Sequence, residues 1–201
     1  MKTVYVYPER CIGCKQCEIA CAVAHSESKD IYSMFSEKII SKPRIHIEVG
    51  SDLLTFPNKC RHCNPAPCIE VCPTSALYRD KNTDSVLIDY GKCIACGMCA
   101  IACPFGIINF GKTYKITIDR DVNTKCDNCI DRQKEGLEPA CVEACKTNAL
   151  VFGEINELIA GKRKSVTLAV TRSPDEPEKE IVPEGVRLWR EMLKNLNHSN
   201  R

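Results

Sequence analysis

Cysteine is the residue type in this chain whose spacing can do chemistry, and its most regular run reads Cys93-x2-Cys96-x2-Cys99-x3-Cys103-Pro104. Three thiolates at this spacing can cap three corners of a four-iron, four-sulfur cube, because the small residues between them let backbone amides turn toward sulfur. The last cysteine of such a run ligates a neighbouring cluster. The run therefore predicts a second one nearby.

Three further cysteine groups repeat this pattern with variations. The first has the same spacing, the second has four residues between its second and third cysteine, and the fourth has eleven residues there. These groups are Cys11, Cys14, Cys17 and Cys21; Cys60, Cys63, Cys68 and Cys72; and Cys126, Cys129, Cys141 and Cys145. With the run at Cys93, counted as the third group, they use all 16 cysteines. The repeat predicts four 4Fe-4S clusters, with iron bound only by cysteine.

Loop lengths predict which groups exchange their fourth cysteine. Only residues 73–92, enough for one hairpin, separate groups two and three, so we pair these and leave groups one and four as the outer pair. The predicted ligands are Cys11, Cys14, Cys17 and Cys145 for cluster 1; Cys60, Cys63, Cys68 and Cys103 for cluster 2; Cys93, Cys96, Cys99 and Cys72 for cluster 3; and Cys126, Cys129, Cys141 and Cys21 for cluster 4.

Other occupants of these cysteines have to be weighed. Structural zinc also uses C-x2-C pairs, but it has no use for the third and fourth cysteine of each group. A three-iron cluster in one site stays open, at Cys68 or in the fourth group, where the spacing is least regular. His62 lies between Cys60 and Cys63 and could replace a thiolate. Since each cluster already has four cysteines, we expect His62 to form a hydrogen bond or to face solvent.

Basic residues flank several predicted ligands. Lys59, Arg61, Lys92 and Lys125 each lie one position from a ligand cysteine. A positive charge there could raise the potential of a cluster or guide a partner. For any single one of them, solvated surface charge is the expected role.

Composition narrows the class of protein. In a short secreted chain, so many cysteines would indicate disulfides, but residues 1–10 hold no apolar signal core, cleavage site or twin arginine, so we expect a cytoplasmic protein. No run of 18 apolar residues occurs, which predicts no transmembrane segment and membrane association only through partners. The formal net charge is +2, and four clusters with about two negative charges each would bring it to roughly −6. Nucleic acid is therefore not an expected partner.

The cysteine groups alternate with short elements. Alternating apolar residues predict strands over 3–7, 44–49, 75–78, 85–90, 106–110, 114–119 and 149–152, with another over 165–170. Residues 18–25 read as a short helix with His25 at its end, and residues 26–42 as an insertion loop with a helical turn. The unit of strand, cysteine loop, short helix and strand thus occurs four times.

The expected fold is α+β, with two interlocked bacterial-ferredoxin-like modules and a C-terminal extension. Residues 1–170 form the four-cluster domain, with an inner module over about 54–120 and an outer module over about 1–50 plus 121–170. Residues 171–183 form a charged, proline-rich linker. Residues 184–201 form a C-terminal helix, which packs back on the domain, docks a partner or is a frayed end.

The cysteine groups resemble a known family over about residues 3–153. Their order, the segment Cys63-Asn-Pro-Ala-Pro-Cys68 and the long spacer of the fourth group are similar to four-cluster electron-transfer subunits of the dimethyl-sulfoxide-reductase, formate-dehydrogenase and formate-hydrogenlyase type. Within that family, the chain is most similar to CooF-type iron-sulfur partners of nickel-iron carbon monoxide dehydrogenase. The residues that carry this closer similarity are 8–14, 44–48 and 56–68. Ala22 and Lys146 replace the proline expected after a fourth cysteine.

The resemblance implies a function. It implies electron relay from carbon monoxide dehydrogenase to a hydrogenase or an NAD(P)H-linked reductase, with a molybdenum or tungsten oxidoreductase such as formate dehydrogenase as the alternative partner. The sequence contains no Ser-His-Asp arrangement, P-loop or dinucleotide loop, so we expect an electron-transfer subunit and not an enzyme. A non-redox scaffold, in which clusters only staple the chain together, is the competing class.

Overall fold

The computed structural model describes residues 2–50, 53–117, 119–170, 188, 191 and 192. The predicted linker over 171–183 lies outside the described residues. The predicted C-terminal helix over 184–201 is described only at residues 188, 191 and 192, which are helical. No helix among the described residues is long and apolar enough to cross a membrane.

The described strands form four antiparallel pairs. They are β1 (Lys2–Val6) with β8 (Leu150–Glu154), β2 (Ile45–Val49) with β3 (Thr55–Lys59), β4 (Leu77–Arg79) with β5 (Val86–Ile88), and β6 (Phe110–Gly111) with β7 (Val122–Asn123). The first strand therefore pairs with the last, with Val4 opposite Phe152. This pairing brings the first cysteine group beside the fourth.

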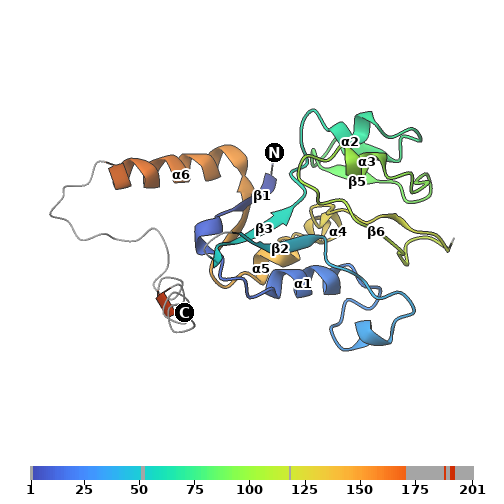
Figure 1. Ribbon diagram of the computed structural model, residues 1–201, viewed down its shortest axis with the longest axis horizontal. Coiled ribbons are helices and arrows are strands. Elements are labelled where there is room, and N and C mark those ends of the chain that lie inside the picture. Colours follow the sequence, from blue (N-terminus) through green and yellow to red (C-terminus); the bar gives the residue numbers. More distant parts are fainter. Residues whose placement is uncertain (1, 51–52, 118, 171–187, 189–190, 193–201) are drawn as a thin grey trace, which may run out of the picture.

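The helices are mostly short. They are α1 (Gln16–Ala24), α2 (Pro67–Glu70), α3 (Met98–Ile101), α4 (Ile130–Lys134), α5 (Ala140–Glu143) and α6 (Ile155–Val170), with single 3-10 turns at Pro8–Arg10 and Ser33–Ser36. Figure 1 shows α2, α3 and β5 gathered at one end, β1 and α6 toward the other, and β2 and β3 between them. The chain is thus a mixed α/β structure of small strand pairs and short helices.

Cysteines form much of the core. One cluster of buried side chains joins Cys17, Cys21 and Cys141 to aliphatic residues of β1, β2 and β8. A second joins Cys60 and Cys99 to residues of β4, β5 and the segment before β6. Because thiols stand where a core usually has aliphatic side chains, binding of metal by these cysteines would add to the stability of the fold.

Most sequence-based elements are confirmed. Strands were expected over 3–7, 44–49 and 149–152, and β1, β2 and β8 lie there within about two residues. The hairpin of β4 and β5, helix α1 and the helical turn in the insertion loop are confirmed as well. In each of these segments, local pattern and burial agree.

The expected strand over 106–110 is wrong except at its last residue, where β6 begins, and the expected strand over 114–119 is wrong as well. Residues 114–117 form turns, and β6 pairs instead with β7 at Val122 and Asn123. These two side chains are fully buried, whereas Lys115 and Thr117 are exposed. The alternation over 114–119 is too short to outweigh the burial that β7 gains.

The expected strand over 165–170 is also wrong, because these residues are the last turns of α6. The preceding segment, 155–164, is rich in good helix formers, and helix formation is cooperative once nucleated. No neighbouring strand offers these residues a partner within the described part of the chain.

Strand β3 was not expected from the sequence. It contains Pro57, which disfavours a central strand but is compatible with an edge. β3 pairs only with β2, placing Pro57 opposite Ile47 and leading directly into the second cysteine group.

Candidate cluster-binding sites

The four C-x2-C loops share one backbone turn. The residue before the second cysteine has a positive φ in every group: Gly13 at 71°, His62 at 50°, Ala95 at 55° and Asn128 at 61°. In the left-handed region, such a turn points successive amides to one side of the loop. Each loop is therefore shaped to present N–H groups to sulfur.

Two of these loops show the resulting N–H···S contacts directly. The amide of His62 donates to Cys60 Sγ at 3.4 Å, and the amide of Asn128 donates to Cys126 Sγ at 3.4 Å. Elsewhere, Arg44 N–H donates to Cys21 Sγ and Asn123 Nδ2 to Cys99 Sγ, both at 3.3 Å. Donors of this kind stabilise thiolate sulfur in iron-sulfur sites.

The third cysteine of every group begins a helix. Cys17, Cys68, Cys99 and Cys141 each occupy the second position of α1, α2, α3 and α5, respectively. The loop and the first helical turn thus fix the three local thiols of a group relative to one another.

The thiols assigned to cluster 1 lie together. Burial, followed by the nearby thiolates of Cys11, Cys145 and Cys14, raises the pKa of Cys17 to about 12. Cys11 and Cys145 also pack against the same buried cluster as Cys17. Cys145 reaches this site through α5, although it is far from group one in sequence.

The thiols assigned to cluster 4 lie together as well. Burial raises the pKa of Cys21 well above its usual range, and Cys126, Cys141 and Cys129 add to the effect. Cys21 leaves its own group because it lies one helical turn beyond Cys17 on α1. Free thiols with such raised pKa values hold their protons, so metal binding has to displace them.

The inner sets follow the same rule. Cys72, Cys93, Cys96 and Cys99 line one small cavity. Cys60, Cys68 and Cys103 belong to a second group of packed side chains, which also includes Cys72, Cys99 and Cys126. Cys63 lies in the loop between Cys60 and Cys68. Burial and the thiolates of Cys60 and Cys103 raise the pKa of Cys68 to about 11, against the opposing charge of Lys125.

Neighbouring sets lie close to one another. Cys17 and Cys141 belong to one cluster of packed side chains, and Cys60, Cys68, Cys99 and Cys126 belong to another. The first set is thus near the fourth, the fourth near the second, and the second near the third. It stays a prediction that the four thiols of each set bind one cluster. The chemistry of the sites fits 4Fe-4S clusters, because the ligands are all cysteines and backbone or side-chain N–H groups donate to their sulfurs.

A buried polar network supports the fourth set. Asp127 accepts hydrogen bonds from Arg44 Nη1 at 2.6 Å and is paired with His25 Nε2 at 3.0 Å. Burial alone would raise the pKa of Asp127, but His25 and Arg44 hold it far below its usual value. Arg44 Nη2 also donates to Tyr90 Oη at 3.3 Å. Sequence reasoning placed His25 at a helix end, which is confirmed, and missed Asp127 as its partner.

His62 is buried, so facing solvent is excluded and the expected hydrogen bond is confirmed. Its Nδ1 accepts from the Val86 amide at 3.0 Å, which puts the proton on Nε2. Among the described residues, Nε2 has no partner although it is inaccessible to solvent. The Nε2–H group is thus a buried donor that lacks an acceptor, in the loop between Cys60 and Cys63. A cluster bound by this loop would bring sulfide, which can accept such a hydrogen bond.

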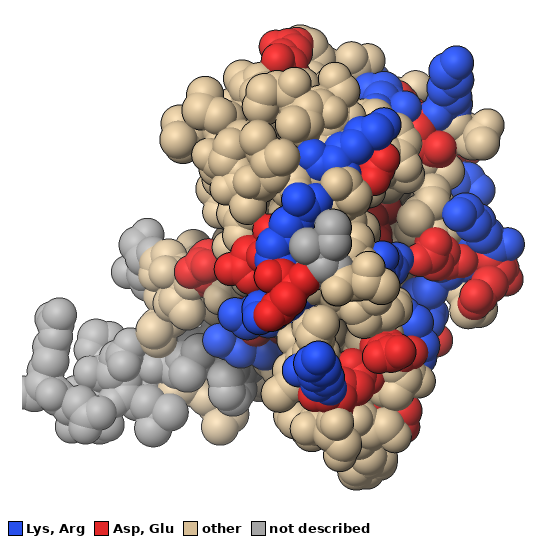
Figure 2. All heavy atoms as spheres, turned by 90° about the vertical axis from the view of Figure 1, so that its right-hand side faces the viewer, with Lys and Arg blue, Asp and Glu red and all other residues tan. Residues whose placement is uncertain are grey.

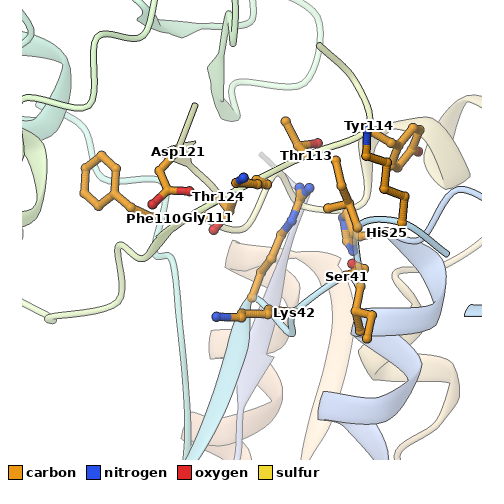
Figure 3. A pocket seen from close by; sticks show the side chains of 14 residues that line it. His25, Ser41, Lys42, Phe110, Gly111, Thr113, Tyr114, Asp121 and Thr124 are labelled. Carbon is orange, nitrogen blue, oxygen red and sulfur yellow. The ribbon is translucent and has the colours of Figure 1, made fainter. Parts of the chain in front are cut away.

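One cavity outside the cysteine sets has a volume of about 400 Å³ and lies between residues 38–44 and 110–124. Figure 3 shows His25 and Tyr114 on one side of it and Asp121 on the other. The lining holds several cations but no nucleophile paired with a base.

Comparison with known proteins identifies the family. Residues 51–155 match the family model described as a 4Fe-4S dicluster domain, and residues 8–24 match one described as a 4Fe-4S binding domain. The chain belongs to the 4Fe-4S ferredoxin-like electron-transfer proteins. The first match spans groups two to four and the second covers group one.

Individual relatives of this iron-sulfur protein agree. The chain is 38% identical to the electron transport protein HydN of Escherichia coli over 171 residues, or 79% of this chain and 93% of HydN. It is 38% identical to the thiosulfate reductase electron transfer subunit PhsB of Salmonella typhi over 153 residues, or 74% of this chain and 73% of PhsB. It is 34% identical to a subunit of the anaerobic dimethyl sulfoxide reductase of E. coli over 167 residues, or 77% of this chain and 74% of that subunit.

Proposed function

We propose that this iron-sulfur protein binds four 4Fe-4S clusters, with the cysteine pairing predicted from the sequence, and relays single electrons along them in the order 1–4–2–3. The observation that supports this order is the packing of cysteines from neighbouring sets in shared clusters of side chains: Cys17 with Cys141 in one, and Cys60, Cys68, Cys99 and Cys126 in the other. When bound, the clusters supply the one-electron redox chemistry. The chain positions them, screens them from water and donates N–H groups to their sulfurs.

The two ends of this order are where the relay meets its partners. Cys14 of the first set and Cys96 of the third are the two exposed cysteines. Around Cys96 the surface is apolar, with Ile101 80% exposed and Ile94 55% exposed. Figure 2 views the molecule from the end where α2 and α3 lie. The upper part of this surface, over these two helices, has few charged side chains, and the part below it has charges of both signs. An exposed apolar patch of this kind suits protein docking.

The donor in this proposal is a nickel-iron carbon monoxide dehydrogenase, and the acceptor is a hydrogenase or an NAD(P)H-linked reductase. The similarity of residues 8–14, 44–48 and 56–68 to CooF-type proteins supports this choice. A molybdenum or tungsten oxidoreductase is the second candidate partner. It is favoured by the names of two relatives, which belong to a thiosulfate reductase and a dimethyl sulfoxide reductase.

Anaerobic reduction of the purified, cluster-loaded protein tests the relay. Four clusters predict about 16 irons per chain and bleaching of the visible band by a low-potential donor, with spin signals from several reduced clusters. Full iron content without reduction by any donor would instead support the scaffold. A count near eight irons would contradict the four-cluster proposal.

Mixing experiments test the partner. Carbon monoxide and a catalytic amount of its dehydrogenase are expected to bleach the protein within minutes, and formate with formate dehydrogenase serves as the comparison. Bleaching only by the formate system would transfer the assignment to the second candidate. With either result, the proposal that the protein relays electrons is unaffected.

A further inference from the structure

Four basic residues occupy the same position in the repeat but not the same environment. Arg10, Lys59, Lys92 and Lys125 each come directly before the first cysteine of a group. Lys59 and Lys125 are only 1% exposed, whereas the Lys92 side chain is 62% exposed. The expectation of solvated surface charge is therefore wrong for Lys59 and Lys125, and it holds for Lys92.

The ammonium group of Lys125 reaches the second cysteine group. Its Nζ lies 4.0 Å from Cys60 Sγ and donates to the carbonyl oxygens of Val86 and, at 2.7 Å, Cys126. Burial raises the pKa of Cys68, and the charge of Lys125 offsets part of this rise. Although Lys125 belongs to group four in sequence, its charge faces the thiols assigned to cluster 2.

The ammonium group of Lys59 lies beside the same cysteine, Cys60. Its Nζ donates to the Cys60 carbonyl at 2.9 Å. Its charge opposes burial in setting the pKa of Cys126 and of Cys141. Lys59 therefore places a second buried charge beside group two.

Two buried ammonium groups need a counterion. Burying an unpaired charge is costly, and buried lysines are normally paired. No carboxylate among the described residues forms an ion pair with either lysine, and the nearby carboxylate of Asp127 is already bound by Arg44 and His25. Backbone carbonyls satisfy N–H donors but do not neutralise the charge. The partial negative charge of cluster-bound sulfur is the remaining counterion.

We propose that Lys59 and Lys125 are buried counterions beside Cys60, where the second cysteine set meets the fourth, and that together they raise the potential of cluster 2. This rests on the cysteine pairing of the proposed function. A fixed positive charge stabilises the reduced, more negative state of a cluster, so each lysine raises a potential. Cluster 2, a central step of the relay, is thereby made easier to reduce than sulfur and burial alone would allow.

The test is a potentiometric titration of cluster-loaded protein followed by electron paramagnetic resonance. The variants are Lys59→Met and Lys125→Met, which remove the charge and keep the apolar stem. At a fixed ambient potential, each is expected to lower the reduced-to-oxidised ratio of one cluster by at least about tenfold, or about 59 mV for one electron. Lys92→Met, at the same position in the repeat but exposed, is expected to change every ratio by less than about twofold.

Further variants keep the test decisive if the Met variants lose iron. Lys59→Arg and Lys125→Arg retain the charge, and Lys59→Gln and Lys125→Gln retain polarity without it. A counterion role predicts that the Arg variants keep iron and potentials closer to the unmodified protein than the Gln variants do. The opposite order overturns the inference.

The inference and the relay fail in distinguishable ways. Charge-removing variants that keep full iron and unchanged potentials overturn the counterion role and leave the relay intact. An unmodified protein that holds no reducible clusters overturns the proposed function first.

Discussion

Asp127 links the helix end at His25 to the guanidinium of Arg44 beside the fourth cysteine set. The three side chains are buried, so their charges interact through a medium of low dielectric constant. The carboxylate has a lowered pKa. Its stabilising contribution is therefore fully present above its unfolded pKa of about 3.9 and is lost as pH falls through the lower folded value.

Asp127→Asn is expected to destabilise the protein at about pH 8, where the carboxylate is ionised. Removing one partner of a buried pair costs about 3–5 kcal/mol, because the other charge is left uncompensated. The rate of cluster bleaching in denaturant under anaerobic conditions measures the effect. Asp131→Asn, which breaks the surface pair of Asp131 with Lys115, serves as control and should change the rate little. Equal rates for the two variants would contradict the network.

Gly13→Ala is expected to weaken the first cysteine loop. The residue has φ 71°, and an added Cβ would lie 2.9 Å from Thr55 Cγ2. The backbone conformation alone costs about 1–2 kcal/mol. Thr55→Ser removes the clashing methyl and keeps the hydroxyl that donates to the Cys11 carbonyl at 3.1 Å. The double variant should therefore recover part of the loss, measured as the thermal rate of cluster release.

Ala95→Gly provides the matched control in the third loop. Ala95 already tolerates φ 55° at the corresponding position. Its replacement is expected to be neutral or stabilising, and slower cluster release after Gly13→Ala than after Ala95→Gly would contradict the argument.

At the residue scale, the sequence predicts the cysteines but not their charged surroundings. The spacing of ligands is a local property, because three of them lie in one loop and helix turn. Lys59, Lys92 and Lys125 have the same local context, and only tertiary packing separates the two buried residues from the exposed one. Asp127 likewise finds Arg44 and His25 only after segments distant in sequence have packed.

At the scale of elements, α6 is held to the N-terminal segment by a few contacts. Lys162 Nζ pairs with Glu9 Oε1 at 2.6 Å and lies 5.5 Å from the centre of the Tyr7 ring. Leu158 lies 3.6 Å from the point where Gly153 would carry a Cβ. Burial raises the pKa of Glu9, but Lys162 and backbone donors more than offset it, so the net shift is downward.

Lys162→Ala is expected to loosen α6 without affecting the clusters. Such partly exposed pairs are worth about 0.2–1 kcal/mol, so amide exchange over 155–170 should rise by about two- to fivefold. Lys164→Ala, an exposed change on the same helix, is the control. The contribution of the pair is present above about pH 4.3 and is lost as pH falls through the lowered pKa of Glu9. A change in the cluster spectra would contradict this separation of α6 from the sites.

The elements that the sequence misjudged share a physical cause. The apolar alternation over 114–119 and the β-branched run over 165–170 are both local signals, and each was overridden by a longer-range effect. Burial of Val122 and Asn123 decides the first, and continuation of a helix decides the second. β3 is the opposite case, a strand that the sequence pattern did not predict. Pro57 weakens the strand pattern there, but pairing with β2 stabilises the extended conformation.

At the scale of the whole molecule, the exchange of cysteines between groups can be tested by counting iron. Cys21→Ala with Cys141→Ala removes two ligands of one proposed cluster and is expected to cost about four irons. Cys21→Ala with Cys17→Ala removes one ligand from each of two clusters, and two altered spin signals are expected. If the second pair instead abolished a single cluster and left the others unchanged, Cys21 would belong to the Cys11 cluster and the pairing would be wrong.

The repeat of four cysteine groups predicts the family, and the comparisons confirm it. The order of the sets in space was beyond the sequence, because it depends on how the outer groups pack against the inner ones. The structure brings together most thiols of the predicted sets, although Cys72, Cys99 and Cys126 also pack with the thiols of cluster 2. Which thiols share a cluster stays a prediction.

The pairing of β1 with β8 also constrains the order in which the protein can mature. During synthesis, the N-terminal strand leaves the ribosome long before its partner at Leu150–Glu154 exists. On the proposed pairing, the inner clusters can be inserted once Cys103 has emerged, whereas the first group has to keep three reactive thiols unsatisfied until Cys145 arrives. A chain whose translation stops between Cys103 and Cys126 would therefore hold only clusters 2 and 3. Clusters 1 and 4 would be present only in chains that extend to Cys145.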